Sequence, residues 1–187
     1  MAFLMQHIAI IGAGQSGGAG PAISGTQLAR RCAEAGFLTV LEDIQRSRLR
    51  HASAELAASA ASSDLPNLRY STSIEDAVRT ADLVMDTVPD ELESKLEILS
   101  LLDRMAPPAT LFATPTSHLS IADLGSCTYR PMQCFGLRFA AAGSSALALV
   151  EITHVPGCAP STLEELRTFF QSLGLAVEVT PDLQPLP

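Results

Sequence analysis

Short apolar runs alternate with longer amphipathic segments along the whole chain. Runs that are apolar throughout are typical of buried parallel strands, and apolar residues spaced three and four apart are typical of helices. This alternation predicts one α/β domain built on a doubly wound, mainly parallel sheet. The expected strands are 8–11, 37–41, 68–71, 83–88, 110–114, 132–139, 146–153 and 175–179, and the expected helices are 21–35, 44–63, 74–81, 91–105, 121–124 and 161–173.

Strands that alternate with helices in this way predict the Rossmann-like class of fold. We expect the domain to occupy residues 1–180 and to be followed by a proline-rich, irregular tail at 181–187. Two helix starts carry a hydroxyl followed three residues later by an acid, which is the capping-box pattern. These are Ser73 with Asp76 and Ser161 with Glu164.

The first strand ends in a glycine turn. Gly12, Gly14 and Gly17 satisfy G-x-G-x-x-G, and such a turn brings together backbone amides and a helix N-terminus that suit a pyrophosphate. More glycines follow directly, so the helix is expected to begin only at Pro21. The structural alternative is a strand-to-helix turn whose enlarged loop fills or distorts the phosphate site.

Ligands of doubly wound sheets bind at the carboxyl ends of the strands. That rule selects a rim of candidate residues: Gly12–Gly25, Asp43, Val88–Asp90, Thr114–His118 and Arg138.

Composition narrows the function classes. The chain has 187 residues, of which 47% are hydrophobic and 17% charged, as in a compact globular domain. The net charge is -8 and no stripe of Lys and Arg is present, which argues against nucleic acid as a partner. An acidic cofactor must therefore be bound by backbone amides and local positive groups.

The four cysteines show no C-x-x-C spacing, so we expect reduced thiols in a cytoplasmic protein and no metal site. The apolar segment 1–11 lacks a basic region, and no run approaches the roughly 20 apolar residues of a membrane span. Neither a signal peptide nor membrane insertion is expected.

Several stretches resemble a known family in their order and spacing. Together they make the chain similar to the NAD-binding domain of the L-3-hydroxyacyl-CoA dehydrogenases over nearly its whole length. The resemblance implies NAD as cofactor and a small 3-hydroxyacyl compound as substrate. The stretches are Ala81–Pro89 with Lys95, Ala106–Pro108, Thr114–Ile121, Gly136–Phe139 and Leu149–Glu151.

The resemblance also implies which residues bind the cofactor. Gly12, Gly14 and Gly25 would line the pyrophosphate, which leaves an insertion between the second and third of these glycines. Asp43 matches the acid on the ribose hydroxyls, and its charge would repel a 2′-phosphate, so NAD is preferred over NADP. Asp90 and Lys95 match further positions that contact the cofactor.

The family's general base is a His in a His-Phe-Phe-Asn-Pro run, and this chain has Arg138 at that place. Arginine stays protonated and cannot accept the hydroxyl proton. Glu151 matches the partner acid of that His, so an ion pair with Arg138 is expected, although the connecting turn is longer here. Ser117 matches a hydroxyl that contacts substrate, and the neighbouring His118 is a candidate for a displaced base.

Two further departures concern size. The segment between the ribose acid and the next strand, 44–67, is short compared with the family's helical excursion that helps to hold coenzyme A. The family's C-terminal helical domain, which closes the site and forms the dimer, is expected to be absent because the chain stops at Pro187.

Three functions remain open. The first is an NAD-dependent oxidoreductase of the 3-hydroxyacyl-CoA dehydrogenase type, with catalysis impaired by Arg138. The second is a non-catalytic dinucleotide-binding or structural module that acts as a homodimer or partner subunit. The third is a reductase in which Arg138 binds the carboxylate of an acidic substrate.

Overall fold

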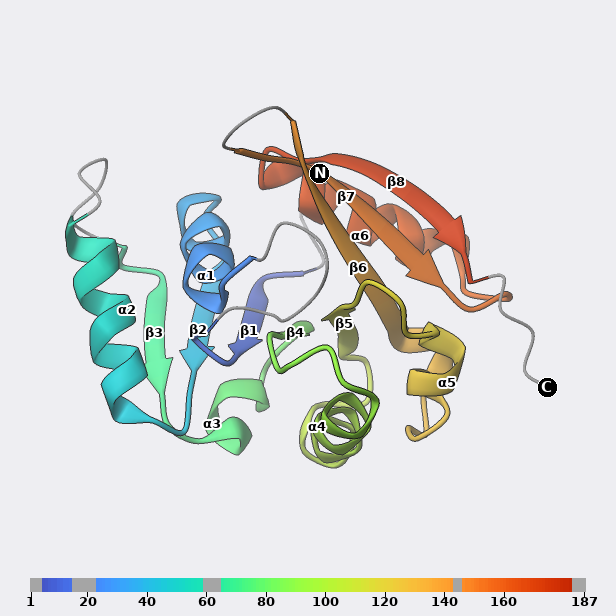
Figure 1. Ribbon diagram of the computed structural model, residues 1–187, viewed down its shortest axis with the longest axis horizontal. Helices are drawn as coiled ribbons and strands as arrows, with labels where there is room; N and C mark the ends of the chain where they lie inside the picture. Colours follow the sequence, from blue (N-terminus) through green and yellow to red (C-terminus); the bar gives the residue numbers. More distant parts are fainter. Residues whose placement is uncertain (1–4, 15–22, 59–64, 143–145, 183–187) are drawn as a thin grey trace.

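An eight-stranded sheet forms the centre of the molecule (Figure 1). The computed structural model describes residues 5–14, 23–58, 65–142 and 146–182. The strands are β1 His7–Ile11, β2 Leu38–Glu42, β3 Leu68–Ser71, β4 Leu83–Asp86, β5 Leu111–Pro115, β6 Cys134–Ala142, β7 Ala146–His154 and β8 Ala176–Pro181. The helices are α1 Gly25–Glu34, α2 Arg46–Ala58, α3 Ile74–Val78, α4 Leu92–Met105, α5 Ile121–Gly125 and α6 Pro160–Ser172, with a 3-10 turn η1 at Pro131–Gln133.

The strand order is β3-β2-β1-β4-β5-β6-β7-β8. All neighbouring strands are parallel except β6 and β7, which are antiparallel. This confirms the Rossmann-like, mainly parallel sheet. The chain runs outward from β1 to β3 and then crosses to β4 on the other side of β1, so the direction of winding reverses between β1 and β4. In open α/β sheets, ligands bind beside the carboxyl ends of the strands at such a reversal.

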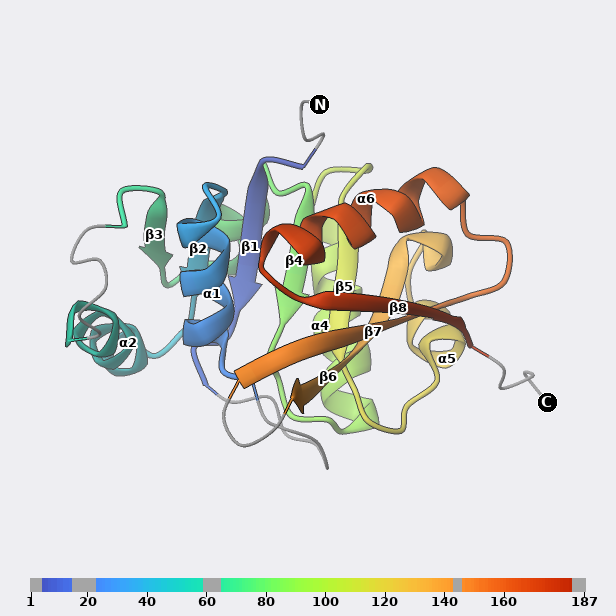
Figure 2. The same cartoon turned by 90° about the horizontal axis from the view of Figure 1, so that it is seen from above.

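Helices cover both faces of the sheet, which is why β4 and β5 are buried along their whole length (Figures 1 and 2). One hydrophobic cluster packs α1, α2 and α6 on the face that carries Ile8 and Ile10. The other cluster packs α3, α4 and α5 on the face that carries Ala9 and Ile11. Successive residues of a strand point to opposite faces, so continuous apolar runs are what a sheet covered on both sides needs.

Two helix starts differ from the predictions. Helix α1 begins at Gly25, whereas the prediction placed its start at Pro21, which lies outside the described residues. Ser24 caps the helix. Its hydroxyl accepts from the Gln27 amide, and the Gln27 side chain accepts from the Ser24 amide. Helix α6 begins at Pro160, and its N-cap, Ala159, has no side-chain cap. The capping box predicted at Ser161 is therefore wrong, since the first helical position is taken by a proline with a suitable fixed φ.

The other boundaries shift by a few residues. Ser73 accepts from the Asp76 amide, as predicted. Helix α2 starts at Arg46, and the predicted end at Ser63 lies outside the described residues. In the tail predicted to be irregular, β8 includes Pro181, and residues 183–187 lie outside the described part.

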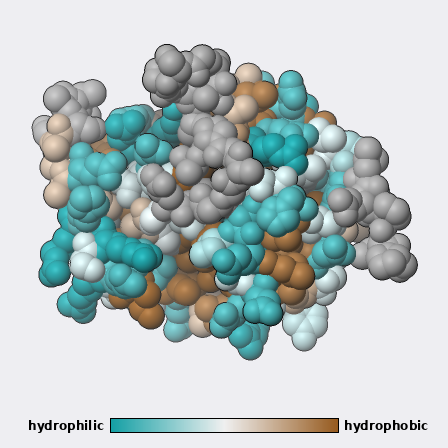
Figure 3. Space-filling view, viewed as in Figure 1, coloured by the Kyte–Doolittle hydropathy of each residue, from teal (hydrophilic) through white to brown (hydrophobic). Residues whose placement is uncertain are grey.

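Polar side chains gather along the margin of the molecule formed by α2 (Figure 3). Among the described residues, no helix combines the length and the apolar character that crossing a bilayer requires.

Candidate functional site

The glycine turn after β1 joins three elements at the point where the winding reverses. Gly12 has a φ of +94°, and its amide donates to the Glu42 carbonyl of β2 at 2.8 Å. From β4, the Thr87 hydroxyl donates to the Gly12 carbonyl at 2.8 Å. A side chain on Gly12 would be strained and would place its Cβ 2.7 Å from the Thr87 hydroxyl oxygen. The turn therefore requires glycine here.

Gly25 packs its backbone directly on this turn. A Cβ at Gly25 would lie 1.8 Å from the Gly12 carbonyl oxygen, so only glycine lets α1 approach β1 this closely. The Gly25 amide donates to the Gly14 carbonyl at 2.8 Å, which closes the turn across the inserted segment. Gly14 differs, because the nearest described group to a Cβ there is the Arg48 guanidinium, at 3.9 Å. Gly14 borders a groove on the surface of the domain.

Asp43, at the carboxyl end of β2, is the buried acid of this region. Its Oδ2 accepts from the Ala13 amide at 3.1 Å and its Oδ1 from the Gln45 amide at 2.8 Å. The Arg48 guanidinium lies 3.6 Å from Oδ2. Because Asp43 accepts from an amide of the glycine turn, the predicted ribose acid and the predicted pyrophosphate glycines lie together. The residue before it, Glu42, is buried as well, and burial, together with the charge of Asp43, raises the pKa of Glu42 to about 7.

Gly12, Gly14 and Arg48 border a groove of about 710 Å³, and the buried Asp43 lies behind its wall, where it accepts from the Ala13 amide. A diphosphate fits the chemistry of the groove, because glycine backbone adjoins a helix start there. The groove is therefore the candidate site for the diphosphate of a dinucleotide, and the Asp43 carboxylate is its nearest buried acid. The described lining is Gly12–Gly14, Ser24, Thr26, Gln27, Ser47, Arg48, His51, Ala52, Glu55 and Thr87–Pro89.

Lys95, predicted to contact the cofactor, lies beneath the rim. Its side chain is completely buried, and its Nζ donates to Asp86 Oδ1 at 2.7 Å. Asp86 is the last residue of β4, and its side chain is 1% exposed. Such a pair is tolerated only because each charge neutralises the other.

Asp90, Ser117 and His118 form a hydrogen-bonded cluster at the ends of β4 and β5. Asp90 Oδ2 accepts from the Ser117 amide at 2.8 Å and from its hydroxyl at 2.9 Å. His118 Nδ1 lies 3.1 Å from the Ser117 hydroxyl oxygen and 3.4 Å from Asp90 Oδ2. The Asp90 side chain is 4% exposed, and its Oδ1 has no hydrogen-bond partner among the described residues.

The cluster favours an ionised Asp90. Burial raises the pKa of this carboxyl, but the hydrogen bonds from Ser117 and Thr116 and the charge of Lys95 lower it more, so the pKa lies below its ordinary value. The buried Asp90 carboxylate and the Ser117 hydroxyl lie next to the imidazole of His118 and fix the orientation of its ring.

Arg138 on β6 and Glu151 on β7 are directly opposite in the antiparallel pair. The Arg138 guanidinium donates to Glu151 Oε2 at 2.9 Å, which matches the expected ion pair. Ala148 is left without a partner where the register shifts, so a β-bulge accommodates the extra length of the connection. Arg138 also donates to the Ser117 carbonyl at 3.3 Å, which links this pair to the cluster around Asp90.

Sequence comparison identifies the family. A model described as the NAD binding domain of 3-hydroxyacyl-CoA dehydrogenase matches residues 7–182. The chain belongs to this family.

Individual relatives agree with this assignment. The mitochondrial hydroxyacyl-coenzyme A dehydrogenase of Sus scrofa is 29% identical over 189 residues, covering 91% of this chain and 57% of that protein. A probable 3-hydroxybutyryl-CoA dehydrogenase of Bacillus subtilis is 26% identical, covering 94% of this chain and 62% of that protein. The solved 3-hydroxybutyryl-CoA dehydrogenase of Escherichia coli K12 aligns with a TM-score of 0.81 and 26% identity over 95% of this chain and 38% of its own. The chain thus spans less than two thirds of these relatives.

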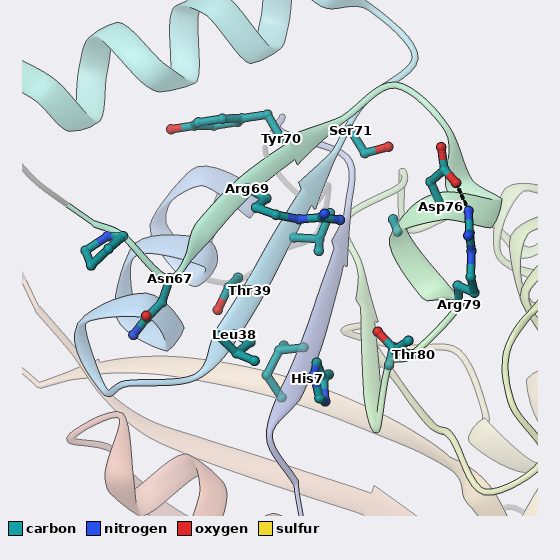
Figure 4. A pocket seen from close by; sticks show the side chains of 15 residues that line it. His7, Leu38, Thr39, Asn67, Arg69, Tyr70, Ser71, Asp76, Arg79 and Thr80 are labelled. Atoms are coloured by element: carbon teal, nitrogen blue, oxygen red, sulfur yellow. Dashed lines mark hydrogen bonds and ion pairs between the residues drawn. The ribbon is translucent and has the colours of Figure 1, made fainter.

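This 3-hydroxyacyl-CoA dehydrogenase domain has a second, larger groove of about 860 Å³ on the sheet face beside α3 (Figure 4). Leu38 and Thr39 lie on its sheet side, and Arg79 is paired with Asp76 at its edge. None of the predicted site residues lines it. The larger hollow is therefore separate from the residues that carry the family chemistry.

Sequence reasoning missed four residues of the cofactor groove. Ser24 and Gln27 match the capping-box pattern in the sequence, but the helix start was predicted at Pro21 because glycines precede it. Thr87 gives no sequence signal, because its role depends on β4 lying beside the turn. Arg48 lies in the first turn of α2 and reaches Asp43 only in three dimensions. In the described part of the chain, no three His, Cys, Asp or Glu side chains are grouped so that they could hold a metal ion.

Proposed function

We propose that the chain is an NAD-binding domain of the 3-hydroxyacyl-CoA dehydrogenase type in which the family's proton-transfer step is impaired. The observation that carries this proposal is the ion pair of Arg138 with Glu151 at 2.9 Å. Removing hydride from a secondary alcohol requires a group that takes the hydroxyl proton, and a guanidinium has no acceptor. The position that resembles the family base is therefore occupied by a permanent cation.

The cofactor groove supports NAD as the ligand. Gly12 and Gly14 line the groove and offer backbone to a diphosphate, Gly25 holds α1 against the glycine turn, and Asp43 lies next to the turn, where its carboxylate would accept from ribose hydroxyls. A 2′-phosphate would meet the charge of Asp43, so NAD is preferred over NADP. When bound, NAD supplies the hydride acceptor of the family reaction.

Calorimetric titration with NAD, together with an NADH absorbance assay, tests this proposal. We expect saturable binding of NAD and, with 3-hydroxybutyryl-CoA, a rate at the buffer baseline between about pH 6 and pH 10. Absence of NAD binding, or turnover clearly above the baseline, contradicts it. A non-catalytic domain of this kind would act as a homodimer or partner subunit, which sedimentation of the purified chain measures.

A second candidate is an active oxidoreductase with a displaced base, and the cluster around Asp90 favours it. If His118 Nδ1 donates to Asp90, Nε2 is the ring nitrogen that can accept a hydroxyl proton. Arg138, 3.3 Å from the Ser117 carbonyl, would then lie close enough to hold a substrate carboxylate or carbonyl oxygen.

One series of variants distinguishes the two candidate functions. Activity of the unmutated chain that increases as an imidazole loses its proton, and that His118→Ala abolishes, supports the second candidate. His154→Ala is the matched control, because this histidine lies at the far end of β7. A baseline rate in all three proteins supports the first candidate.

A further inference from the structure

Arg48 extends from α2 to the glycine turn. Its guanidinium nitrogen lies 3.6 Å from Asp43 Oδ2 and 3.9 Å from the position that a Cβ on Gly14 would occupy. The Arg48 side chain is 56% exposed, so it can change its rotamer without disturbing the core. The cation therefore lies between the predicted ribose site and the predicted diphosphate site.

The groove needs a cation because its other charges are acidic. Among the described residues that line it, Arg48 is the only Arg or Lys, and Glu55 is a carboxylate on the same helix. Asp43 lies directly behind the turn and is held by the Ala13 amide. A diphosphate adds two negative charges to this region, which backbone dipoles alone offset poorly when acids are so close.

The start of α1 has fewer free backbone amides to donate to a phosphate than an uncapped helix start. The Gln27 amide, one of the first-turn donors, is already engaged by the Ser24 hydroxyl at 3.1 Å. An anion at this helix start must compete with that internal cap. The Arg48 guanidinium, 3.9 Å from the position of a Cβ on Gly14, can compensate for the lost donor.

We propose that Arg48 binds the diphosphate of the dinucleotide cofactor and that its departure from Asp43 leaves that carboxylate to the ribose hydroxyls. The inference rests on the proposed binding of NAD and adds to it a residue that the family resemblance does not mark. Arginine suits this role, because its planar fork can move from one anion to another with little loss of hydrogen bonding.

Calorimetric titration of NAD into the unmutated chain, Arg48→Ala, Arg48→Lys and Arg50→Ala tests the proposal. Arg50 is a matched control, because it carries the same charge on the exposed side of the same helix and is not among the described residues that line the groove. We expect Arg48→Ala to raise the Kd for NAD about tenfold, Arg48→Lys to raise it less, and Arg50→Ala to leave it unchanged. Arg48→Ala should also reduce the salt dependence of NAD binding.

Three results overturn the inference. Equal Kd values for NAD in Arg48→Ala and the unmutated chain remove Arg48 from the site and leave the proposed function intact. A loss confined to NADP means that Arg48 contacts a 2′-phosphate instead of the diphosphate. If the unmutated chain binds neither NAD nor ADP, the proposed function fails together with this inference.

Discussion

Two regions lie on the same edge of the sheet but are built differently. The glycine-turn region comprises Gly12–Gly14, Gly25 and Asp43 with the nearby Lys95–Asp86 pair, and the proposed proton-transfer region comprises Asp90, Ser117, His118 and the Arg138–Glu151 pair. Around the turn, the polar groups are buried and interlocked: Asp43 holds the Ala13 amide, and Lys95 and Asp86 form a pair that is 0% and 1% exposed. In the second region Asp90 is buried, but the Arg138 and His118 side chains around it lie at the surface. Arg138 is 55% exposed and His118 is 63% exposed.

The difference explains how one site can change while the other is kept. A buried charge or a glycine in close contact cannot be replaced without an energetic cost to folding, so folding itself preserves the glycine-turn region. An exposed ion pair contributes little to stability, so the side chains of the proton-transfer region can be exchanged while the fold stays intact. We therefore expect substitutions in the glycine-turn region to cost more stability than substitutions at Arg138 and Glu151.

The largest expected effect tests the buried pair. Lys95→Met leaves Asp86 ionised and uncompensated in the core, and we expect a loss of about 4 kcal/mol in the free energy of unfolding. Urea denaturation followed by circular dichroism measures this loss. The double variant Lys95→Met/Asp86→Leu should recover much of it, because no charge then remains buried. A single variant as stable as the unmutated chain would remove the contrast between the regions.

The next effect concerns close backbone packing. Gly25→Ala puts a Cβ 1.8 Å from the Gly12 carbonyl oxygen, so α1 must move away from β1, at a cost of about 3 kcal/mol. Gly14→Ala is the matched control, since the nearest described group to its Cβ is the flexible end of Arg48, at 3.9 Å. We expect Gly14→Ala to keep its stability and to lose NAD affinity. Equal stability losses in both variants would contradict the packing argument.

The acids at the end of β2 give a pH-dependent effect. The pKa of Glu42 is raised from 4.5 to about 7, mainly by burial. Between these values the folded chain binds more protons than the unfolded chain, so the free energy of unfolding falls as the pH rises. Glu42→Gln should abolish a fall of about 2 kcal/mol between about pH 5 and pH 8. The control is Glu55→Gln on the exposed surface of α2, which should leave the fall unchanged.

The sequence predicted the sheet well because the signal is local. Continuous apolar runs such as 8–11 and 83–85 indicate strands buried on both faces, and each has a counterpart in the structure. The start of α1 was less accessible. Glycines and Pro21 favour a turn by their own backbone preferences, whereas the helix begins where the Ser24 cap and the Gly25 contact with Gly12 coincide.

The sequence could identify a site residue only where the residue type and its place relative to a predicted strand suggested a role. Asp43 and Ser117 could be placed on the rim because each follows a strand, and Arg138 because the predicted strand ended at residue 139, although β6 continues to Ala142. Their partners could not be placed in the same way. Arg48 meets Asp43, and Ala148 forms the bulge beside the Arg138 pair, through distances and registers that depend on the packing of separate elements.

The smallest expected effect lies in the proton-transfer region. Arg138→Ala removes an ion pair in which the Arg138 side chain is 55% exposed and the Glu151 side chain 25% exposed. We expect the free energy of unfolding to change by less than about 0.5 kcal/mol. Glu151→Gln should behave in the same way, and urea denaturation measures both. A loss comparable to that of Lys95→Met would mean that the pair is needed for the β6–β7 register. Folding, rather than the loss of proton transfer, would then explain why an arginine occupies this position.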